Sequence, residues 1–242
     1  MTSAQRTVLI SGANKGIGLE TARQLAAEGY RVYVGTRDLA NGQAAIESLH
    51  LPDADLRAIQ LDVTDAASVA AAAAQIDAEV GQLDVLINNA GIAIDLAPPS
   101  QVGLDKMRQT YDVNVYGPIT LTQAMLPLLR KAQTRVVVNL SSELGSTTLH
   151  GYPDFAYYGV NLAAYNMSKA ALNMYTVLLA KELRDEGFHI NAINPGYTAT
   201  DLNNHQGTRS VQQAAAVVVK YATLDKSGPN GGFYTDGGAM PW

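Results

Sequence analysis

The sequence has no cysteine among its 242 residues, and only 16% of those residues are charged. Without cysteine, the chain can form no disulfide framework, no thiolate zinc site and no cysteine nucleophile. The 17 Lys and Arg against 22 Asp and Glu give a net charge of −5, with no run of basic residues. This balance argues against nucleic acid or an anionic membrane as a partner, because phosphates would require a basic face.

Long apolar runs are also missing, and none approaches the length that spans a bilayer. The segment 1–16 reaches Gly and Asn too early for the apolar stretch of a signal peptide. The four histidines, His50, His150, His189 and His205, are scattered, so we expect no metal site. The sequence therefore predicts a soluble, cytoplasmic protein, and its 47% hydrophobic composition with low net charge excludes disorder.

Short apolar runs rich in β-branched residues alternate with Ala- and Leu-rich stretches of helical spacing. The runs predicted as buried strands are 7–11, 31–35, 56–61, 84–87, 135–140, 189–194 and 232–235. Predicted helices include 18–28, 66–80 and 163–186. This alternation predicts right-handed βαβ crossovers. We therefore expect an α/β fold in one domain over residues 1–242, with a doubly wound parallel sheet of about seven strands and helices on both faces.

A glycine-rich turn follows the first predicted strand and leads into a helix: Ser11-Gly12-Ala13-Asn14-Lys15-Gly16-Ile17-Gly18. Its glycines allow a tight turn, a close approach of the backbone to a pyrophosphate, and close packing of helix on strand. The start of the helix adds unpaired N–H groups and the positive end of its dipole. The candidate phosphate contacts are Gly12, Asn14, Lys15, Gly16, Ile17 and Gly18, although such turns also occur for structural reasons alone.

The Gly-x-x-x-Gly-x-Gly spacing of this turn resembles the short-chain dehydrogenase/reductase family, and further motifs of that family follow along the chain. The resemblance implies a Rossmann-type fold. Asp62-Val63, after the third predicted strand, resembles the pair that holds the adenine, although Asp62 could instead cap a helix. Asn88-Asn89-Ala90-Gly91, after the fourth, resembles a family signature, so Asn89, Ala90 and Gly91 are implied cofactor contacts. Asn89 would contact the cofactor ribose or stabilise the central sheet.

The end of the second predicted strand bears on the choice of cofactor. NAD-binding dinucleotide folds carry an acidic residue there for the ribose 2′-hydroxyl, whereas this chain reads Val34-Gly35-Thr36-Arg37. Arg37, together with Lys15, could neutralise a 2′-phosphate that a carboxylate would repel. The alternative is that Arg37 pairs with Asp38 or lies in solvent. Two cations at these two places predict NADP(H) as the cofactor.

Tyr165 and Lys169 lie four residues apart in a predicted helix, which places their side chains on one face. A phenol with a pKa near 10 is a poor acid–base group at neutral pH, but a nearby ammonium favours the phenolate and lowers that pKa. Tyr165 could then protonate a ketone oxygen as hydride arrives. Taken alone, such a pair is usually a half-buried Tyr beside a solvated Lys. The family resemblance implies that both residues also contact the cofactor.

Other segments match the rest of the family's catalytic set. The Ser-x-x-Gly step after the fifth strand favours Ser142 over Ser141 as the hydroxyl that stabilises the carbonyl oxygen, although either could serve in a turn or cap. The resemblance assigns to Asn114 a water that links Lys169 to solvent. Around the nicotinamide it implies a segment containing Pro195 and Gly196, with carboxamide contacts from the Thr198 backbone and the Thr200 hydroxyl.

The separation of 23 residues from Ser142 to Tyr165 is longer than in many family members, because of an insertion at about 149–164. A comparable but longer insertion occurs in the carbonyl reductase branch, which this chain also resembles in Ser-Gly-Ala-Asn-Lys-Gly-Ile-Gly and in its terminal Trp. There it covers a helix face used for tetramers, so we expect a monomer or homodimer. The aromatic side chains of the insertion either line an apolar substrate pocket or pack the insert onto the domain.

The sequence thus predicts an NADPH-dependent carbonyl reductase acting on a small carbonyl substrate that is apolar or aromatic. Its catalytic residues are Asn114, Ser142, Tyr165 and Lys169. Two alternatives remain open: an NAD(P)-dependent alcohol or sugar dehydrogenase that works in the oxidative direction, and a non-catalytic NADPH-binding regulator. The missing acidic residue at Thr36 argues against the usual NAD form of the first, and the intact catalytic set argues against the second.

Overall fold

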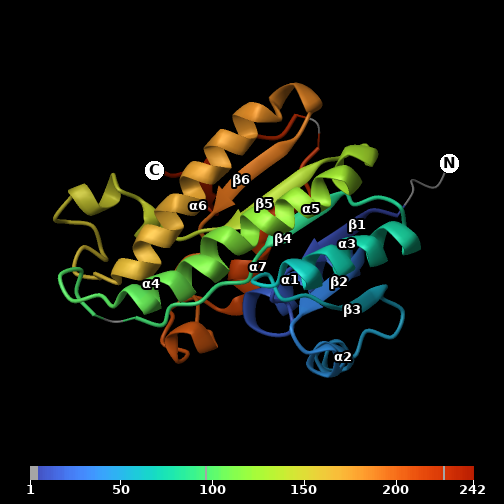
Figure 1. The fold of residues 1–242 in the computed structure, drawn as a ribbon, viewed down its shortest axis with the longest axis horizontal. Helices are drawn as coiled ribbons and strands as arrows, with labels where there is room; N and C mark the ends of the chain where they lie inside the picture. The colour runs from blue at the N-terminus through green and yellow to red at the C-terminus, as the bar shows by residue number, and fades with distance from the viewer. Residues whose placement is uncertain (1–4, 96, 226) are drawn as a thin grey trace.

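Strands and helices alternate along the computed structural model, which describes residues 5–95, 97–225 and 227–242. The prediction that the segment 1–16 is not a signal peptide therefore falls in part, at residues 1–4, outside the described residues. The strands are β1 (Thr7–Ile10), β2 (Arg31–Thr36), β3 (Leu56–Gln60), β4 (Val85–Asn88), β5 (Val136–Leu140), β6 (His189–Ile193), β7 (Phe233–Thr235) and β8 (Gly238–Ala239). They form one sheet in the order β3-β2-β1-β4-β5-β6-β7-β8, and Figure 1 labels β1 to β6 of this sheet.

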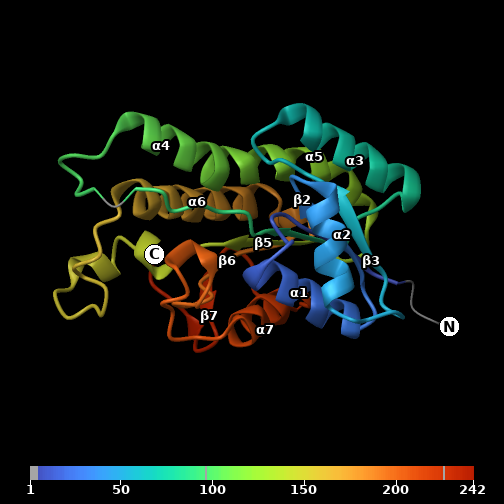
Figure 2. The same cartoon turned by 90° about the horizontal axis from the view of Figure 1, so that it is seen from below.

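Seven helices connect these strands: α1 (Gly16–Ala27), α2 (Leu39–Ser48), α3 (Ala66–Glu79), α4 (Leu104–Tyr111), α5 (Gly117–Lys131), α6 (Ala163–Glu182) and α7 (Val211–Ala222) among the described residues. Figure 2 shows α1, α2 and α7 on one side of the sheet and α3, α4, α5 and α6 on the other. Short helical turns add η1 (Asp112–Tyr116), η2 (Glu143–Gly145), η3 (Leu149–Gly151), η4 (Arg184–Glu186) and η5 (Asp201–Asn203). The fold is therefore a three-layer, doubly wound α/β structure.

Strand residues alternate between two cores, one on each face of the sheet. Val8 and Ile10 of β1 pack into the core under α1 and α7, whereas Leu9 between them packs into the core under α3, α5 and α6. Because both faces are covered, every residue of β1, β4 and β5 is buried. This burial explains why the strands read as continuous apolar runs.

The sheet differs from the prediction at its edge. It has eight strands instead of about seven, and β8 pairs antiparallel with β7 through Tyr234↔Ala239 and Thr235↔Gly238. The other neighbours are parallel, as predicted. The first helix begins at Gly16, two residues earlier than predicted, and the long helix ends at Glu182 before the separate turn η4.

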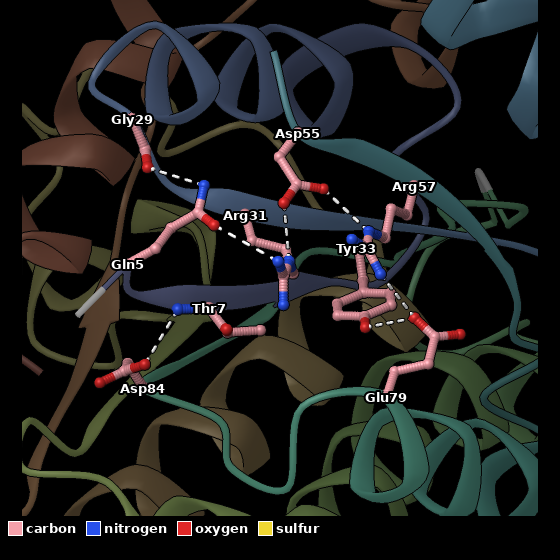
Figure 3. A network of polar contacts seen from close by, with 9 residues as sticks. All are labelled: Gln5, Thr7, Gly29, Arg31, Tyr33, Asp55, Arg57, Glu79 and Asp84. Carbon is pink, nitrogen blue, oxygen red and sulfur yellow. Dashed lines mark hydrogen bonds and ion pairs between the residues drawn. The ribbon is translucent and has the colours of Figure 1, made fainter.

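A polar network joins the amino-terminal ends of β1, β2, β3 and β4 (Figure 3). Arg31 and Arg57 both pair with Asp55, at 2.7 and 2.8 Å. Arg57 also pairs with Glu79, which accepts a hydrogen bond from the Tyr33 hydroxyl at 2.7 Å. Burial and the Glu79 charge raise the pKa of Tyr33 to about 12. The network lies at the opposite ends of the strands from the carboxyl edge, so it ties the sheet together away from any site there.

Among the described residues, no helix combines the length and the apolar character needed to cross a bilayer.

Candidate active site

The glycine turn between β1 and α1 is shaped by backbone constraints at the carboxyl edge of the sheet. Gly12 and Gly16 adopt φ values of +62° and +57°, which favour glycine. A Cβ on Gly18 would lie 2.5 Å from Asn89 Nδ2 and 2.9 Å from Ala13 Cα, so α1 packs too closely for a side chain. Gly12 and Gly16 therefore allow the backbone of the predicted turn to bend, and Gly18 allows α1 to pack close to it.

The first turn of α1 is open to an anion. Side chains cap α2, α3 and α7, through Asp38, Asp65 and Ser210. Within the described residues no side chain caps α1, and its first turn contains no acidic residue. The N–H groups at the start of this helix and its dipole therefore suit a phosphate group. This chemistry fits the pyrophosphate of a dinucleotide.

Asn89 fastens the glycine turn to β4. Its Nδ2 donates to the carbonyl oxygens of Ser11 and Gly12, at 2.8 and 2.9 Å. Ser11 Oγ in turn accepts hydrogen bonds from the N–H groups of Asn89 and Ala90, both at 3.1 Å. The Asn89 side chain therefore holds the glycine turn against the end of β4, and its contact with the cofactor ribose stays a prediction. Sequence reasoning did not assign the matching role of Ser11.

The two cations predicted to choose the cofactor, Arg37 and Lys15, lie in different surroundings. Arg37 is exposed and makes no ion pair within 4.0 Å in the described part of the chain, while Asp38 caps α2 instead of pairing with it. Burial acts to raise the pKa of Asp62, but hydrogen bonds from Thr64 and the Arg37 charge together lower it. Asp62 is not a helix cap, since Asp65 caps α3.

Lys15 does not stand free beside the turn. Its Nζ lies 2.6 Å from Asp201 Oδ2, and both side chains are more than half exposed. Asp201 also pairs with His205 Nε2 at 2.9 Å. The Lys15–Asp201 pair thus links the glycine turn to η5, and Lys15 could bind a 2′-phosphate only if this pair opened.

Tyr165, Lys169 and Ser142 come together where β5 ends against α6. The Ser142 side chain acts to lower the pKa of the Tyr165 phenol, so the two side chains lie near each other. Lys169 is 4% exposed, lies 5.6 Å from the Tyr165 ring centroid, and donates from Nζ to the Leu140 carbonyl oxygen at 2.8 Å. A phenol, a hydroxyl and an ammonium are therefore adjacent, as predicted for proton transfer to a carbonyl oxygen.

The pKa of Tyr165 shifts in the direction opposite to the one predicted from the sequence. Burial raises the pKa of Tyr165 to about 12, and the nearby Ser142 side chain opposes that rise. Burial also lowers the pKa of Lys169 to about 8. The prediction that the ammonium lowers the phenol pKa is therefore wrong for the protein alone, because burial of the phenol is the largest influence on its pKa. Tyr165 holds its proton at neutral pH.

Asn114 lies behind Lys169 in η1, a π-helical turn between α4 and α5. Its Nδ2 donates to the Ile92 carbonyl oxygen and to Ser168 Oγ, and its Oδ1 accepts from the Ile92 N–H. A Cβ on Gly91 would lie 3.5 Å from Asn114 Oδ1 and 3.6 Å from Lys169 Nζ, so these three residues surround one small space. A π turn shifts the backbone hydrogen-bond register by one residue, and such turns are frequent at functional sites. The sequence carries no signal for this turn.

Ser141 and Ser142 have separate roles. Ser141 Oγ is buried and donates to Asn173 Oδ1 at 2.6 Å, so it holds β5 against α6. Ser142 caps η2, because its Oγ accepts from the Leu144 N–H, and its side chain also reaches Tyr165. The structure therefore supports the preference for Ser142, whose roles as a turn cap and as a partner of Tyr165 coexist.

The segment 195–200 crosses the carboxyl edge after β6. Gly196 has φ +77°, and its N–H donates to Asn194 Oδ1. The Thr198 carbonyl oxygen accepts from Asn203 Nδ2 at 2.9 Å, whereas the methyl group of Thr200 lies over Gly16, 3.6 Å from where a Cβ would stand. The structure thus brings Thr200 next to the glycine turn and engages the Thr198 carbonyl oxygen within its own loop.

The predicted insertion divides into two parts. Phe155 and Tyr157 continue an aromatic series from His150 to Tyr197, with centroid separations of 5.3, 5.7 and 6.0 Å. Tyr152 and Tyr158 are exposed, and a cavity of about 430 Å³ lies among Pro99, His150, Tyr158, Asn161, Ala163, Asn166 and Met167. Residues 163 and 164 already belong to α6. The aromatic series thus reaches the carboxyl-edge segment at Tyr197, whereas Tyr158 borders the cavity. A substrate pocket lined by these aromatic side chains stays a prediction.

The outer face of α6 bears on the expected oligomeric state. Met167, Met174 and Leu178 are 48, 60 and 54% exposed, so the insertion leaves these three apolar side chains uncovered. The expectation of a monomer or homodimer stays a prediction, and light scattering would test it.

The open parallel sheet and the glycine turn at β1–α1 define a dinucleotide-fold α/β protein. A model of the short chain dehydrogenase family matches residues 6–210. The (-)-isopiperitenone reductase of Mentha piperita is 34% identical, and the alignment covers 97% of each chain. The chain belongs to the short-chain dehydrogenase/reductase family and is an oxidoreductase.

Solved structures agree with this assignment. An NADPH-bound carbonyl reductase from chicken fatty liver has a TM-score of 0.87 and 31% identity, covering 98% of this chain and 99% of its own. A 3-ketoacyl-(acyl-carrier-protein) reductase from Brucella melitensis, complexed with NADH, has a TM-score of 0.82 and 25% identity, covering 96% of both chains. Both cofactors thus occur on this fold, and the choice between them depends on local residues.

Proposed function

We propose that the protein is an NADPH-dependent carbonyl reductase that converts a ketone or aldehyde to an alcohol. The observation that carries this proposal is the buried Lys169 ammonium, whose Nζ lies 5.6 Å from the centroid of the Tyr165 ring. Ser142 follows the end of β5 on the same side and influences the Tyr165 phenol. Named reductases among the similar proteins, from Mentha piperita and from chicken fatty liver, support the reductive direction.

In this proposal, Ser142 and Tyr165 hold the carbonyl oxygen by hydrogen bonds. When bound, the reduced nicotinamide supplies a hydride, that is, two electrons and a proton, to the carbonyl carbon. As the C=O π bond breaks, Ser142 stabilises the negative charge on oxygen, and Tyr165 donates its phenolic proton to form the alcohol. Lys169 then returns a proton to the Tyr165 phenolate, and Asn114 connects Lys169 to solvent.

The protonation state of Tyr165 favours reduction over oxidation. With a pKa of about 12, the phenol is protonated at neutral pH and ready to act as the acid. Oxidation of an alcohol would instead require the phenolate as the base, and burial disfavours that form. Lys169, with a pKa of about 8, remains mostly protonated at pH 7 and can supply the proton.

The cofactor preference rests on Arg37. Its exposed guanidinium follows β2, where a carboxylate would repel a 2′-phosphate, and the open N-terminus of α1 accepts the pyrophosphate. We expect Arg37→Ala to raise the KM for NADPH by about tenfold or more, because charge-assisted hydrogen bonds to phosphate contribute roughly 1.5–3 kcal/mol. The KM for NADH should change little. Equal loss with both cofactors would contradict the assignment.

A panel of aromatic and aliphatic ketones tests the activity, with NADPH consumption followed by absorbance. The wild-type protein should reduce at least some of them, and Tyr165→Phe should lower kcat by at least about 10²-fold, the usual contribution of a positioned acid. NADPH binding by the variant should be retained. Equally slow turnover by both proteins, with NADPH still bound, would instead support the non-catalytic regulator.

A further inference from the structure

Arg209, just before α7, lies with its side chain across Gly196, and the mechanism above does not use it. A Cβ on Gly196 would lie 2.6 Å from Arg209 Cδ, and 3.2 and 3.3 Å from its Nη1 and Nε. The guanidinium group and the end of its stem therefore cover this glycine and leave no room for a side chain. Gly196 also has φ +77°, a conformation that other residues adopt only under strain. No motif in the sequence joins the two residues.

The backbone of Arg209 holds the residues that follow Gly196. Its N–H donates to the Tyr197 carbonyl oxygen at 3.0 Å, and its carbonyl oxygen accepts from the Ala199 N–H at 2.9 Å. These bonds form a parallel bridge between Thr198 and Arg209. A substitution of Arg209 by a residue other than proline keeps both backbone groups. The side chain can therefore be changed without loss of this bridge, and only the cover over Gly196 is removed.

Asp236, in the turn between β7 and β8, anchors the guanidinium group. Arg209 Nη2 lies 2.9 Å from Asp236 Oδ2, and only 23% of the Arg209 side chain is exposed. Asp236 Oδ1 accepts from the Thr235 hydroxyl at 3.0 Å and from the Gly237 N–H at 3.1 Å, which fixes the carboxylate. The hydrogen bond from Arg209 is the main cause that lowers the pKa of Asp236 to about 2, so the carboxylate is charged at neutral pH. The pair therefore fastens the segment after β6 to the edge of the sheet.

The segment 196–200 borders the space where the proposed cofactor would lie. It starts after β6 and ends at Thr200, whose methyl group lies 3.6 Å from where a Cβ on Gly16 would stand. In the sheet, β4 and β5 lie between β1 and β6, so the segment passes the carboxyl ends of these strands. A dinucleotide that reaches from the glycine turn after β1 to Tyr165 beside β5 is therefore covered on one side by this segment.

We propose that Arg209 is a positioning residue that keeps the segment 196–200 closed over bound NADPH, with Asp236 as the anchor of its side chain. The inference rests on the proposed function, because that function names the cofactor. Without the guanidinium group, Gly196 regains backbone freedom that cofactor binding has to remove again. Ordering the backbone of one residue lowers affinity by about tenfold. The loss should appear as faster dissociation of NADPH, because the loosened segment is the one that covers the cofactor.

The test measures NADPH dissociation by stopped flow. Protein loaded with NADPH is mixed with excess NADP⁺, and the fluorescence of the bound NADPH is followed as it leaves. Arg209→Met keeps an unbranched side chain without the guanidinium group, and should dissociate about tenfold faster than wild type. Arg209→Lys keeps a cation near Asp236 and should be slower than Arg209→Met. Asp236→Asn, which removes the charge of the anchor, should also dissociate faster than wild type.

Arg130→Met is the matched control, because it removes another arginine ion pair, with Glu186 at 2.7 Å, on a different surface. It should dissociate like wild type. Hydrogen exchange measures the segment itself in protein without cofactor. Peptides that cover 196–200 should exchange several-fold faster in Arg209→Met than in wild type, and Arg130→Met should leave their exchange unchanged.

Unchanged dissociation in Arg209→Met would overturn the inference, whether or not exchange is faster, because the segment would then not retain the cofactor. Equal acceleration by Arg130→Met would also overturn it, since the cause would be general destabilisation. Acceleration by Arg209→Met with Asp236→Asn like wild type would mean that Arg209 binds the cofactor directly, and would overturn the positioning role.

These results are separate from the test of the proposed function. If no ketone is reduced, but NADPH dissociation still depends on Arg209 and Asp236, the reductase is refuted and the positioning role stands. If ketones are reduced and dissociation is the same in wild type and Arg209→Met, the positioning role alone is refuted. Absence of NADPH binding by the wild type would refute both.

Discussion

Replacement of Lys169 by Met should change the free energy of unfolding, and the burial of Lys169 sets the size of this change. The side chain is buried, and its pKa falls from the ordinary value of 10.5 to about 8. At pH 7 the folded protein therefore buries an ammonium, at a cost of about 3 kcal/mol, since one pKa unit corresponds to about 1.4 kcal/mol. Methionine has a similar shape and no charge, so Lys169→Met removes this cost together with the hydrogen bond to the Leu140 carbonyl oxygen.

The sign of the pH dependence follows from proton linkage. Between pH 8 and 10.5 the unfolded chain still holds the Lys169 proton, whereas the folded chain has lost it, so wild-type stability rises through this window. Between pH 7 and 9.5, the free energy of unfolding of the wild type should increase relative to Lys169→Met by about 2 kcal/mol. Other titrating groups are common to both proteins and cancel in the difference.

Urea unfolding at several pH values measures this difference directly. Lys181→Met, at an exposed position on the same helix, is the control, and its difference from wild type should stay constant with pH. A constant difference for Lys169→Met as well would refute the reasoning that desolvation lowers this pKa. In the wild type, the rate of carbonyl reduction should also fall above about pH 8, as Lys169 loses its proton.

Two further predictions concern the glycine turn and its link to η5. Gly18→Ala should destabilise the protein by about 1–3 kcal/mol and weaken NADPH binding, because its Cβ would lie 2.9 Å from the Ala13 backbone. Thermal unfolding checks this against Gly159→Ala, where a Cβ meets nothing within 4 Å. Asp201→Asn should free Lys15 and lower the KM for NADPH on the order of two- to fivefold, as expected for an exposed ion pair. An unchanged or higher KM would mean that Lys15 does not reach the 2′-phosphate.

The sheet could be predicted almost completely, because buried parallel strands read as apolar runs. Strands β1 to β7 each lie within a residue or two of the predicted runs, and the glycines of the turn fall where backbone geometry requires them. The edge strand β8 was missed because it has only two residues and depends on pairing with Tyr234. The predicted helices given above as examples do not include α5, in which Pro118 and Pro127 interrupt the helical pattern.

The sequence predicted which residues form the site, but it did not predict the pKa values of their side chains. Tyr165, Lys169 and Ser142 come together as expected, since their order and spacing along the chain carry the information. Burial could not be read from spacing, so the direction of the Tyr165 pKa was wrong. The Lys15–Asp201 pair joins residues that are distant in the sequence, and no local pattern marks it.

Transfer of deuterium from NADPH to the alcohol product tests most directly whether the protein is an NADPH-dependent carbonyl reductase. The protein is incubated with a reducible ketone and NADPH fully deuterated at C4 of the nicotinamide, and the alcohol is analysed by mass spectrometry. Hydride transfer with Tyr165 as the acid predicts one deuterium on the carbinol carbon with wild-type protein, and almost no alcohol with Tyr165→Phe. Absence of labelled alcohol with the wild type, or equal labelling by Tyr165→Phe, would contradict it.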